Sequence, residues 1–533
     1  MKYIFLLAFL SITPFKKDFS QVVTMGYQNP VIPGFHPDPS VCRVGNDFYL
    51  VNSSFEYFPG IPVFHSTDLI HWKQIGYCLI HKSQLDLTGI PASGGIYAPT
   101  IRYHDGTYFV IVTNVNHGGN FFVTAKDPAG EWSDPVWIDR GGIDPSLFFD
   151  DDGKVYYCGT PAWGDNKQGI YQFEIDIKTG QKITQPRLIW TGTGGRYPEG
   201  PHLYKIRGMY FLMIAEGGTE YGHMETIARS SSPWGPFESY PHNPILTHRN
   251  SNAQINMIQG TGHADLVQAA DGSWWMVFLA FRNTAGQWHH LGRETFLAPV
   301  TWTTDNWPVV NGNGTVNIDM NVPTLAQKDD TGNSMIKYNF DGPKLSYDWN
   351  YLRNPDFSDY SFTEKPGWLR LTGNQYSIDS SASPAFIGRR QEDYHCTIKT
   401  RMNFSPDASG QKAGFTVMMN NDFHYDLVLR RNPDGTNHLI LEYDVDKIHS
   451  VASDIEMKNT DLWLKMTADP VNYHFSYSTD GKTYSDLGMA PTRLLSSEVA
   501  GGFTGVYFGI YAVCPDQGHR VPAYFDWFEY DPN

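Results

Sequence analysis

The sequence predicts an all-β protein: a five-bladed β-propeller followed by a C-terminal antiparallel β-sandwich of the concanavalin or jelly-roll type. Three observations support this prediction. Five segments in the first ~300 residues repeat one hairpin pattern, the last ~200 residues form short alternating runs, and no segment shows long helical periodicity. The 50 glycines and 34 prolines suit a chain that turns often.

The repeated segments start at Asp38, Ala98, Asp144, Glu199 and His263, which are 60, 46, 55 and 64 residues apart. Each start is followed by a short alternating strand, a turn eight or nine residues on, and an aromatic-rich strand, which is a hairpin pattern. This spacing suits a four-stranded sheet with variable loops. Five such sheets bury both faces when they are arranged radially, so we predict a propeller over residues 27–324.

Beyond a polar linker at 325–335, the chain has a different pattern. Period-2 runs separated by turns predict at least eight short strands and a sandwich over 336–533. The predicted strands are 395–404, 414–419, 425–429, 438–443, 463–467, 473–477, 503–513 and 523–530.

Equivalent positions of the innermost strands of a propeller face one central channel, so the five starting residues should form a ring. Three of them are acids, although acids make up only about a tenth of the chain; chance gives such a set in roughly 1 % of cases. Strand-starting Asp-Pro turns could explain Asp38 or Asp144 alone. They do not explain Glu199, which is followed by Gly and Pro.

Two or three carboxyls around one pocket suit the cleavage of a glycosidic bond. One carboxylic acid protonates the leaving oxygen, a second carboxylate deprotonates water on the opposite face, and a third raises the pKa of the acid by repulsion. The net charge is 40 − 56 = −16, which argues against binding to nucleic acid or to an anionic membrane surface.

Six ordered motifs carry a resemblance to a known family: NPVIPGFHPDPSV from Asn29, GGIYAPTIRYHDG, GGIDPSLFFDDDGKVYY, RYPEGPHLYK, GTGHADLV and LGRETFLAPVTW. Together they resemble glycoside hydrolase family 43, in its β-xylosidase and α-L-arabinofuranosidase branch. The resemblance implies an inverting enzyme with Asp38 as general base and Glu199 as general acid. It implies that Asp144 tunes the pKa of the acid and orients it.

The same resemblance implies that Arg293 contacts the sugar, that Phe55, Tyr97 and Ile143 wall the subsite, and that Phe503 closes it from the sandwich. Alternatively, Arg293 is a surface arginine, Phe55 and Tyr97 are ordinary core aromatics, and Phe503 belongs to the core of the sandwich. His263 matches a histidine that often binds calcium or a water cluster in relatives, or it is a channel histidine without metal. No cofactor is expected, and a structural calcium is possible.

We therefore expect an exo-acting enzyme that releases terminal α-L-arabinofuranosyl residues from arabinoxylan, xyloglucan or arabinan oligosaccharides. Tyr97 and Ile143 stand where xylosidases of the family often carry Trp and an aromatic residue, which favours arabinofuranose. The alternatives are a β-D-xylosidase, a bifunctional enzyme and a non-catalytic propeller lectin. A retaining, invertase-like enzyme lacks support, because His36-Pro-Asp-Pro differs from the Asn-Asp-Pro context of that group.

The N-terminus has the features of an export signal over residues 1–20. Lys2 precedes an apolar run at 3–12 that is too short to span a membrane. We expect a periplasmic or secreted protein with a carbohydrate substrate, no nucleic-acid partner and no insertion in the membrane. The five cysteines are widely spaced without a C-x-x-C motif, which argues against zinc and redox sites.

Overall fold

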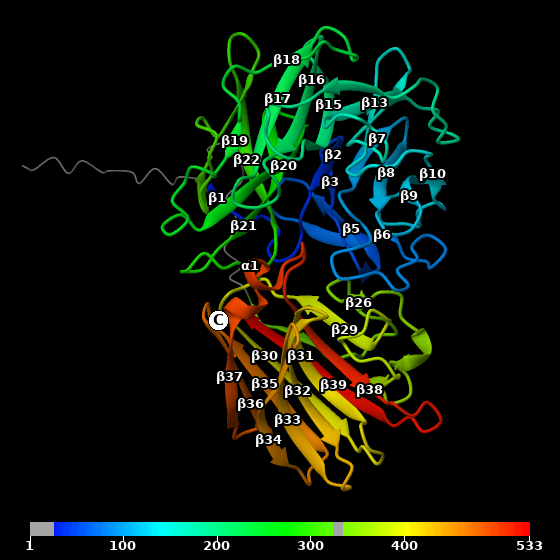
Figure 1. The fold of residues 1–533 in the computed structure, drawn as a ribbon, viewed down its shortest axis with the longest axis vertical. Coiled ribbons are helices and arrows are strands. Elements are labelled where there is room, and N and C mark those ends of the chain that lie inside the picture. Colours follow the sequence, from blue (N-terminus) through cyan, green and yellow to red (C-terminus); the bar gives the residue numbers. More distant parts are fainter. Residues whose placement is uncertain (1–25, 323–333, 533) are drawn as a thin grey trace, which may run out of the picture.

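The computed structural model describes residues 26–322 and 334–532, and it shows two all-β units in contact (Figure 1). The predicted export signal and most of the predicted linker lie outside the described residues. The described residues contain no helix long and apolar enough to cross a membrane. The five cysteines are free and buried.

The N-terminal unit is a propeller whose described strands form five antiparallel blades. Blade 1 contains β2 (Ser40–Val44), β3 (Asp47–Val51), β5 (Gly60–Ser66) and β6 (Lys73–Leu79). Blade 2 contains β7 (Thr100–His104), β8 (Thr107–Asn114), β9 (Gly119–Ala125) and β10 (Val136–Trp137). Blade 3 contains β11 (Ser146–Phe149), β12 (Val155–Gly159), β13 (Ile170–Glu174) and β14 (Arg187–Trp190).

The last two blades follow the same antiparallel order. Blade 4 contains β15 (Glu199–Ile206), β16 (Met209–Glu216), β17 (Met224–Ser230) and β18 (Glu238–Ser239), and β19 (Leu246–Thr247) also pairs with β17. Blade 5 contains β20 (Ile258–Gln268), β21 (Trp274–Arg282), β22 (Glu294–Trp302) and β23 (Pro308–Val310). Because neighbouring blades cover both faces of a middle strand, β21 reads as a continuous apolar run, WWMVFLAFR, rather than as an alternating one.

The start of the chain closes the ring of blades. Strand β1 (Gly26–Gln28) pairs with β24 (Asp319–Asn321) after blade 5. The Asn29 side chain then accepts a hydrogen bond from the backbone of Leu297 in blade 5, at 2.9 Å, before the chain enters blade 1. This closure fixes the segment that leads to Asp38.

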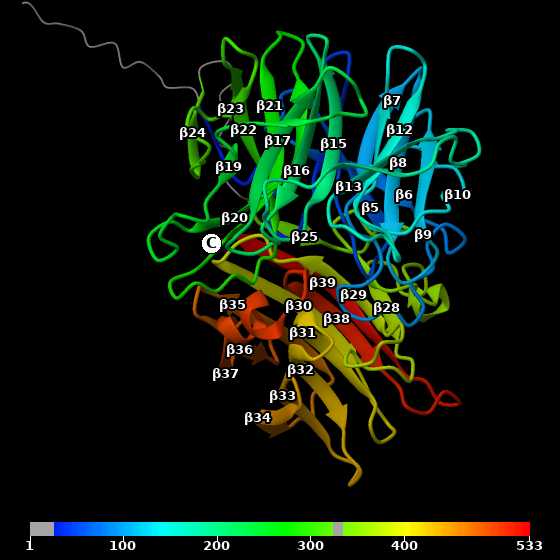
Figure 2. The ribbon, with the colours of Figure 1, turned by 45° about the horizontal axis from the view of Figure 1, so that its top comes forward.

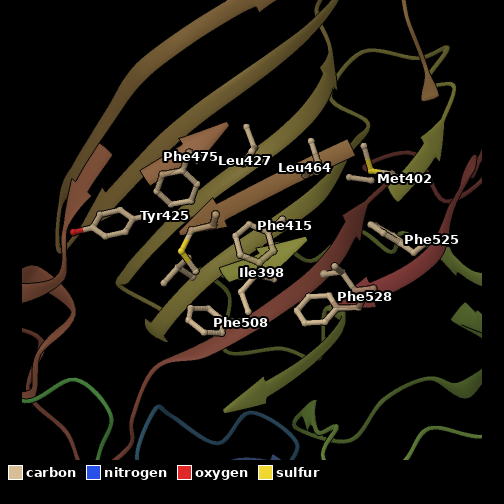
Figure 3. Close-up of a cluster of buried hydrophobic side chains, with 14 of the residues drawn as sticks. Ile398, Met402, Phe415, Tyr425, Leu427, Leu464, Phe475, Phe508, Phe525 and Phe528 are labelled. Carbon is tan, nitrogen blue, oxygen red and sulfur yellow. The ribbon is translucent and has the colours of Figure 1, made fainter. Parts of the chain in front are cut away.

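The C-terminal unit is a sandwich of two antiparallel sheets. One contains β25 (Ile336–Tyr338), β27 (Tyr360–Ser361), β28 (Leu369–Thr372), β39 (Pro522–Pro532), β30 (Cys396–Phe404), β35 (Asp461–Ala468), β36 (Asn472–Ser478) and β37 (Ser485–Pro491). The other contains β29 (Ala385–Arg390), β38 (Tyr507–Val513), β31 (Lys412–Asn420), β32 (Phe423–Arg431), β33 (Asn437–Val445) and β34 (Ile448–Glu456). Figure 3 shows their core, where Phe415 and Leu427 of one sheet meet Ile398 and Phe528 of the other.

The predicted strands of the sandwich coincide with observed strands, with informative differences. The run predicted at 503–513 becomes β38 only at Tyr507, because the residues before it form a loop that contacts the propeller. Strand β29 was not predicted, since it is buried on both faces and does not alternate. Strand β34 was not predicted either, because it is a largely exposed edge strand.

The two units lie against each other (Figures 1 and 2). Their junction is tightly bonded, with β26 (Tyr351–Leu352) and α1 (Ser497–Ala500) on the sandwich side (Figure 1). Strand β26 pairs with β4 (Tyr57–Phe58), which follows β3 and precedes β5 in the sequence. The buried guanidinium of Arg390 donates to the Phe35 carbonyl at 2.6 Å, and that of Arg353 donates to the Ile90 carbonyl at 2.6 Å. The sandwich is thus fixed against the loops that precede and follow Asp38.

Candidate active site

A small pocket of about 70 Å³ lies at the end of the propeller channel that faces the sandwich. All of the site residues predicted from the sequence line it: Asp38, Phe55, Tyr97, Ile143, Asp144, Glu199, His263, Arg293 and Phe503. Ala98, the remaining ring position, and Thr219 complete the lining. Segments spread over more than 450 residues of the chain therefore converge on one hollow.

A repeated backbone conformation aims the ring residues at the channel. Asp38, Asp144 and His263 have φ values of 52°, 53° and 51°, in the left-handed region where Asp and His are enriched. In blade 4 this conformation is displaced by one residue, to Gly200 with a φ of 56°. The Gly200 N–H donates to Asp144 Oδ2 at 3.2 Å, which links blades 3 and 4 beside the pocket.

Asp38 is buried and ionised. Arg293 Nη1 donates to its Oδ1 at 2.9 Å, Ser53 Oγ donates to its Oδ2, and His263 Nδ1 lies 3.8 Å from Oδ1. Burial by itself would raise the pKa of Asp38, but Arg293, His263 and Ser53 together hold it below its ordinary value. This carboxylate can therefore accept a proton from water.

The pKa values of Asp144 and Glu199 are raised, whereas that of Asp38 is lowered. Burial, followed by the negative charge of Asp38, raises the pKa of Glu199 to about 7. Burial and the charges of Glu199 and Asp38 raise the pKa of Asp144 well above its usual range, against the opposing effect of the Gly200 N–H. The pair of carboxyls therefore retains a proton near neutral pH, so a proton donor and a base lie in the same pocket.

Aromatic rings from both domains form one wall of the pocket. The ring centroids of Phe55 and Tyr97 are 5.2 Å apart, and Phe503 lies 6.1 Å from each. The Phe503 N–H donates to Ser93 Oγ at 2.8 Å, and its carbonyl accepts from Arg293 Nη2 at 3.3 Å. Phe503 is thus held over the pocket while the residue remains 39 % exposed.

Comparison with known proteins agrees with this geometry. The family model described as "Glycosyl hydrolases family 43" matches residues 27–308, and that described as "Beta xylosidase C-terminal Concanavalin A-like domain" matches residues 337–531. The chain belongs to glycoside hydrolase family 43. It is a glycosidase with a five-bladed propeller and a concanavalin A-like sandwich.

Similar proteins span more than nine-tenths of this chain. It is 45 % identical to the non-reducing end α-L-arabinofuranosidase BoGH43B of Bacteroides ovatus, covering 95 % of this chain and 94 % of that protein. It is 39 % identical to a xylosidase/arabinosidase of Butyrivibrio fibrisolvens, covering 91 % and 95 %. The solved structure "Bacteroides ovatus Xyloglucan PUL GH43B" superposes with a TM-score of 0.90 at 44 % identity, over 95 % of this chain and all of that one.

The calcium that the family resemblance raised as a possibility at His263 stays a prediction, because His263 belongs to no group of three potential metal ligands in the described residues. In the channel, the Arg102 guanidinium donates to Asp265 Oδ2 and to His202 Nδ1, each at 2.8 Å. The positive charge beside Asp265 and His202 is therefore that of Arg102. Calcium requires six to eight oxygen ligands. In the described part of the chain, one group of three potential ligands is found, and it lies in the sandwich at His424, Asp426 and Asp444.

A buried carboxylate that the sequence analysis missed holds the loop before Glu199. Glu216, the last residue of β16, accepts hydrogen bonds from the N–H groups of Thr193 and Gly195 at 2.9–3.0 Å. Gly192 permits this close approach, because a Cβ there would lie 2.5 Å from Glu216 Oε1. Glu216 occupies no ring position, so no repeat identified it; the Glu-Gly-Gly end of its strand was the available signal.

Proposed function

We propose that this family 43 glycosidase is an exo-acting, inverting enzyme that releases non-reducing-end α-L-arabinofuranosyl residues from hemicellulose oligosaccharides. The observation that carries the proposal is the single pocket in which Asp38 is held ionised while the pKa of Glu199 is raised to about 7. Glycosidic cleavage with inversion needs one carboxylic acid and one carboxylate on opposite sides of the sugar.

In this proposal Glu199 donates its proton to the glycosidic oxygen as the bond to the anomeric carbon breaks. Asp38 takes a proton from a water molecule, whose oxygen attacks the anomeric carbon from the opposite face. Asp38 is then protonated and Glu199 ionised, and exchange with solvent restores both. Asp144 keeps the proton of the acid pair in place by repulsion and orients Glu199 through the backbone of Gly200.

The walls support cleavage at a chain end. Phe503 covers the pocket from the sandwich side, so a terminal unit or a side branch enters but an uninterrupted chain does not. Arg293 lines the pocket and donates to both Asp38 and the Phe503 carbonyl, which supports its predicted contact with the sugar. Tyr97 and Ile143 line the pocket where xylosidases of the family often carry larger aromatics, which supports arabinofuranose.

A second candidate is a β-D-xylosidase or a bifunctional enzyme, which the similarity to a xylosidase/arabinosidase supports. The deciding experiment compares kcat/KM on 4-nitrophenyl α-L-arabinofuranoside and 4-nitrophenyl β-D-xyloside. We expect kcat/KM to be at least tenfold higher on the arabinofuranoside. A higher kcat/KM on the xyloside would contradict the arabinofuranosidase proposal and favour a β-D-xylosidase. Product analysis on arabinoxylan, xyloglucan and arabinan oligosaccharides then identifies the parent polysaccharide.

A non-catalytic lectin would bind the sugar in the same pocket without cleaving it. The proposed enzyme instead hydrolyses the glycoside, and Glu199→Gln lowers the hydrolysis of an oligosaccharide by about a thousandfold while sugar binding persists. We also propose export to the periplasm or the medium, which the Lys2-led apolar run supports. N-terminal sequencing of the protein isolated from cell fractions tests that part.

A further inference from the structure

A hollow on the sandwich is separate from the catalytic pocket. Its volume is about 680 Å³. Three sandwich segments line it: the segment around η1 (Phe357–Asp359), the loop between β28 and β29, and the loop between β38 and β39, which is red in Figure 1. Lys82 lines it from the propeller. Among the described residues, none lines both this hollow and the catalytic pocket, so the two are different spaces.

Two aromatic residues in the lining are exposed. Phe357 is 60 % exposed and Tyr376 is 39 % exposed. The Phe357 ring packs edge-to-face against Tyr351 and Phe58, with ring centroids 5.6 Å and 6.5 Å apart, so its position is fixed although most of the residue is open. The C–H groups on the face of a sugar ring are apolar and pack against such aromatic faces. The hollow therefore offers two stacking surfaces.

The rest of the lining is polar and carries no net charge. The two cations, Lys82 and Arg520, are balanced by the two acids, Asp356 and Asp359. The other polar groups are the amides of Asn354, Asn374, Gln375 and Gln517 and the hydroxyls of Ser358 and Ser383. Amides and hydroxyls donate and accept hydrogen bonds, which matches the hydroxyl groups of a sugar. The charges and the hydrogen-bonding groups of this lining thus suit a neutral ligand rich in hydroxyls.

Hydrogen bonds between the three segments hold the hollow in shape. Asp359 is buried and accepts hydrogen bonds from Asn374 Nδ2 at 3.0 Å and from the Arg520 guanidinium. Arg520 also donates to the carbonyls of Gly373 at 2.8 Å and Thr372 at 2.9 Å. A site whose walls are already bonded to one another requires little reorganisation when a ligand binds.

The hollow is also fixed relative to the propeller. Asn354 Oδ1 accepts a hydrogen bond from the Leu87 N–H at 2.6 Å, and Asn354 Nδ2 donates to the Leu85 carbonyl at 2.9 Å. Leu85 and Leu87 lie in the segment that follows β6 of blade 1. A polymer held in the hollow therefore stays next to the propeller, which raises the local concentration of its other ends and branches around the enzyme.

We propose that this hollow is a non-catalytic binding site for a neutral polysaccharide chain, through which the sandwich keeps the enzyme on its substrate. Phe357 and Tyr376 recognise the ring faces of pyranose units, and the surrounding amides recognise their hydroxyls. At about 680 Å³ the hollow is in the size range of small-ligand sites (~300–1,000 Å³), so it takes a short stretch of the chain. The inference goes beyond the proposed function, because binding here requires no cleavage.

The test is affinity electrophoresis of the full chain in native gels that contain arabinoxylan, xyloglucan or polygalacturonate. Every protein carries Glu199→Gln, so that little polysaccharide is cleaved during the run. Phe357→Ala and Tyr376→Ala are added singly. Tyr347→Ala is the matched control, because Tyr347 is 40 % exposed on the sandwich outside the hollow.

We expect arabinoxylan or xyloglucan to retard the Glu199→Gln protein, and the one that does so identifies a xylan or a glucan backbone as the ligand. Phe357→Ala and Tyr376→Ala should each raise the Kd for that polysaccharide at least fivefold, and Tyr347→Ala should leave it unchanged. Polygalacturonate, which is anionic, should not retard the protein. Without Glu199→Gln, both hollow variants should keep kcat/KM on 4-nitrophenyl α-L-arabinofuranoside within twofold of the wild-type value.

No retardation by either neutral polysaccharide, an unchanged Kd in both hollow variants, or an equal change in Tyr347→Ala would overturn the proposal. Retardation by polygalacturonate that the hollow variants abolish would overturn the neutral ligand. Tyr376→Ala decides the test if Phe357→Ala fails to fold. Failure of the proposed function is separate, because it appears as a wild-type protein that prefers the xyloside or cleaves neither aryl glycoside, whereas retardation does not depend on cleavage.

Discussion

Buried acids in the sandwich and in the propeller pocket behave in opposite ways. In the sandwich, Asp426 accepts hydrogen bonds from His424 Nδ1 at 3.1 Å and from the Tyr511 hydroxyl at 2.6 Å. Burial would raise its pKa, but the charge of His424 and these bonds hold the pKa well below its usual range. In the pocket, burial and a neighbouring carboxylate raise the pKa of Glu199 to about 7.

This difference teaches that burial of a carboxyl does not by itself indicate catalysis. A buried acid with a dedicated cation is a structural ion pair, whereas acids that outnumber their cationic partners keep a proton that can be transferred. Arg293 pairs with Asp38, and Asp144 and Glu199 gather beside that pair. The pocket is thus arranged for proton transfer, and the sandwich cluster is arranged for stability.

The largest expected effect is a loss of kcat on removing Glu199 or Asp38, and the choice of substrate distinguishes their roles. Glu199→Gln and Asp38→Asn should each lower kcat on an arabinosylated oligosaccharide by about a thousandfold, because a proton transfer is lost. With 2,4-dinitrophenyl α-L-arabinofuranoside, whose leaving group needs little protonation, Glu199→Gln should recover most of its activity while Asp38→Asn should not. Equal recovery in both variants would contradict the assigned roles.

In the sandwich, the expected effect is on stability. Asp426→Asn leaves His424 buried without its charge partner, so we expect a loss of about 3 kcal/mol in the free energy of unfolding, measured with denaturant. Its kcat should be unchanged. Asp444→Asn is the matched control, because its carboxylate lies 3.9 Å from His424 Nδ1 and is partly exposed, so it should lose less. A stable but inactive Asp426→Asn would contradict the comparison.

The pH dependence of kcat/KM should show the raised pKa of Glu199 and the lowered pKa of Asp38. Since Glu199 must be protonated, kcat/KM should fall as the pH rises through about 7. Since Asp38 must be ionised and its pKa is lowered, the decline on the acid side should come only below its ordinary value of 3.8. With the dinitrophenyl substrate, the basic decline should disappear in Glu199→Gln; its persistence would assign it to another group.

A smaller effect is expected from the carboxylate that holds the loop before Glu199. Glu216→Gln keeps the shape but places an amide NH₂ against the N–H groups of Thr193 and Gly195. Displacement of Glu199 should lower kcat about tenfold, with KM changed less than twofold. An unchanged kcat with a raised KM would show that this loop serves binding instead.

The ring positions could be predicted from the sequence because each opens a repeated hairpin. In a propeller, equivalent positions of the repeats face the same central channel, so these residues come together. Contributions from outside the repeat were harder to predict. Glu216 ends a strand, and Arg102 lies within one, so neither position marks a site. Only the family resemblance predicted Phe503 at the pocket. Its position depends on how the sandwich packs against the propeller, which the local sequence around Phe503 does not indicate.

The most direct test of the account is proton NMR of the first product formed from 4-nitrophenyl α-L-arabinofuranoside. An ionised Asp38 that activates water, with Glu199 as the acid, predicts that β-L-arabinofuranose appears first. The α-anomer appearing first would require a covalent intermediate, and it would contradict the roles assigned to both carboxyls.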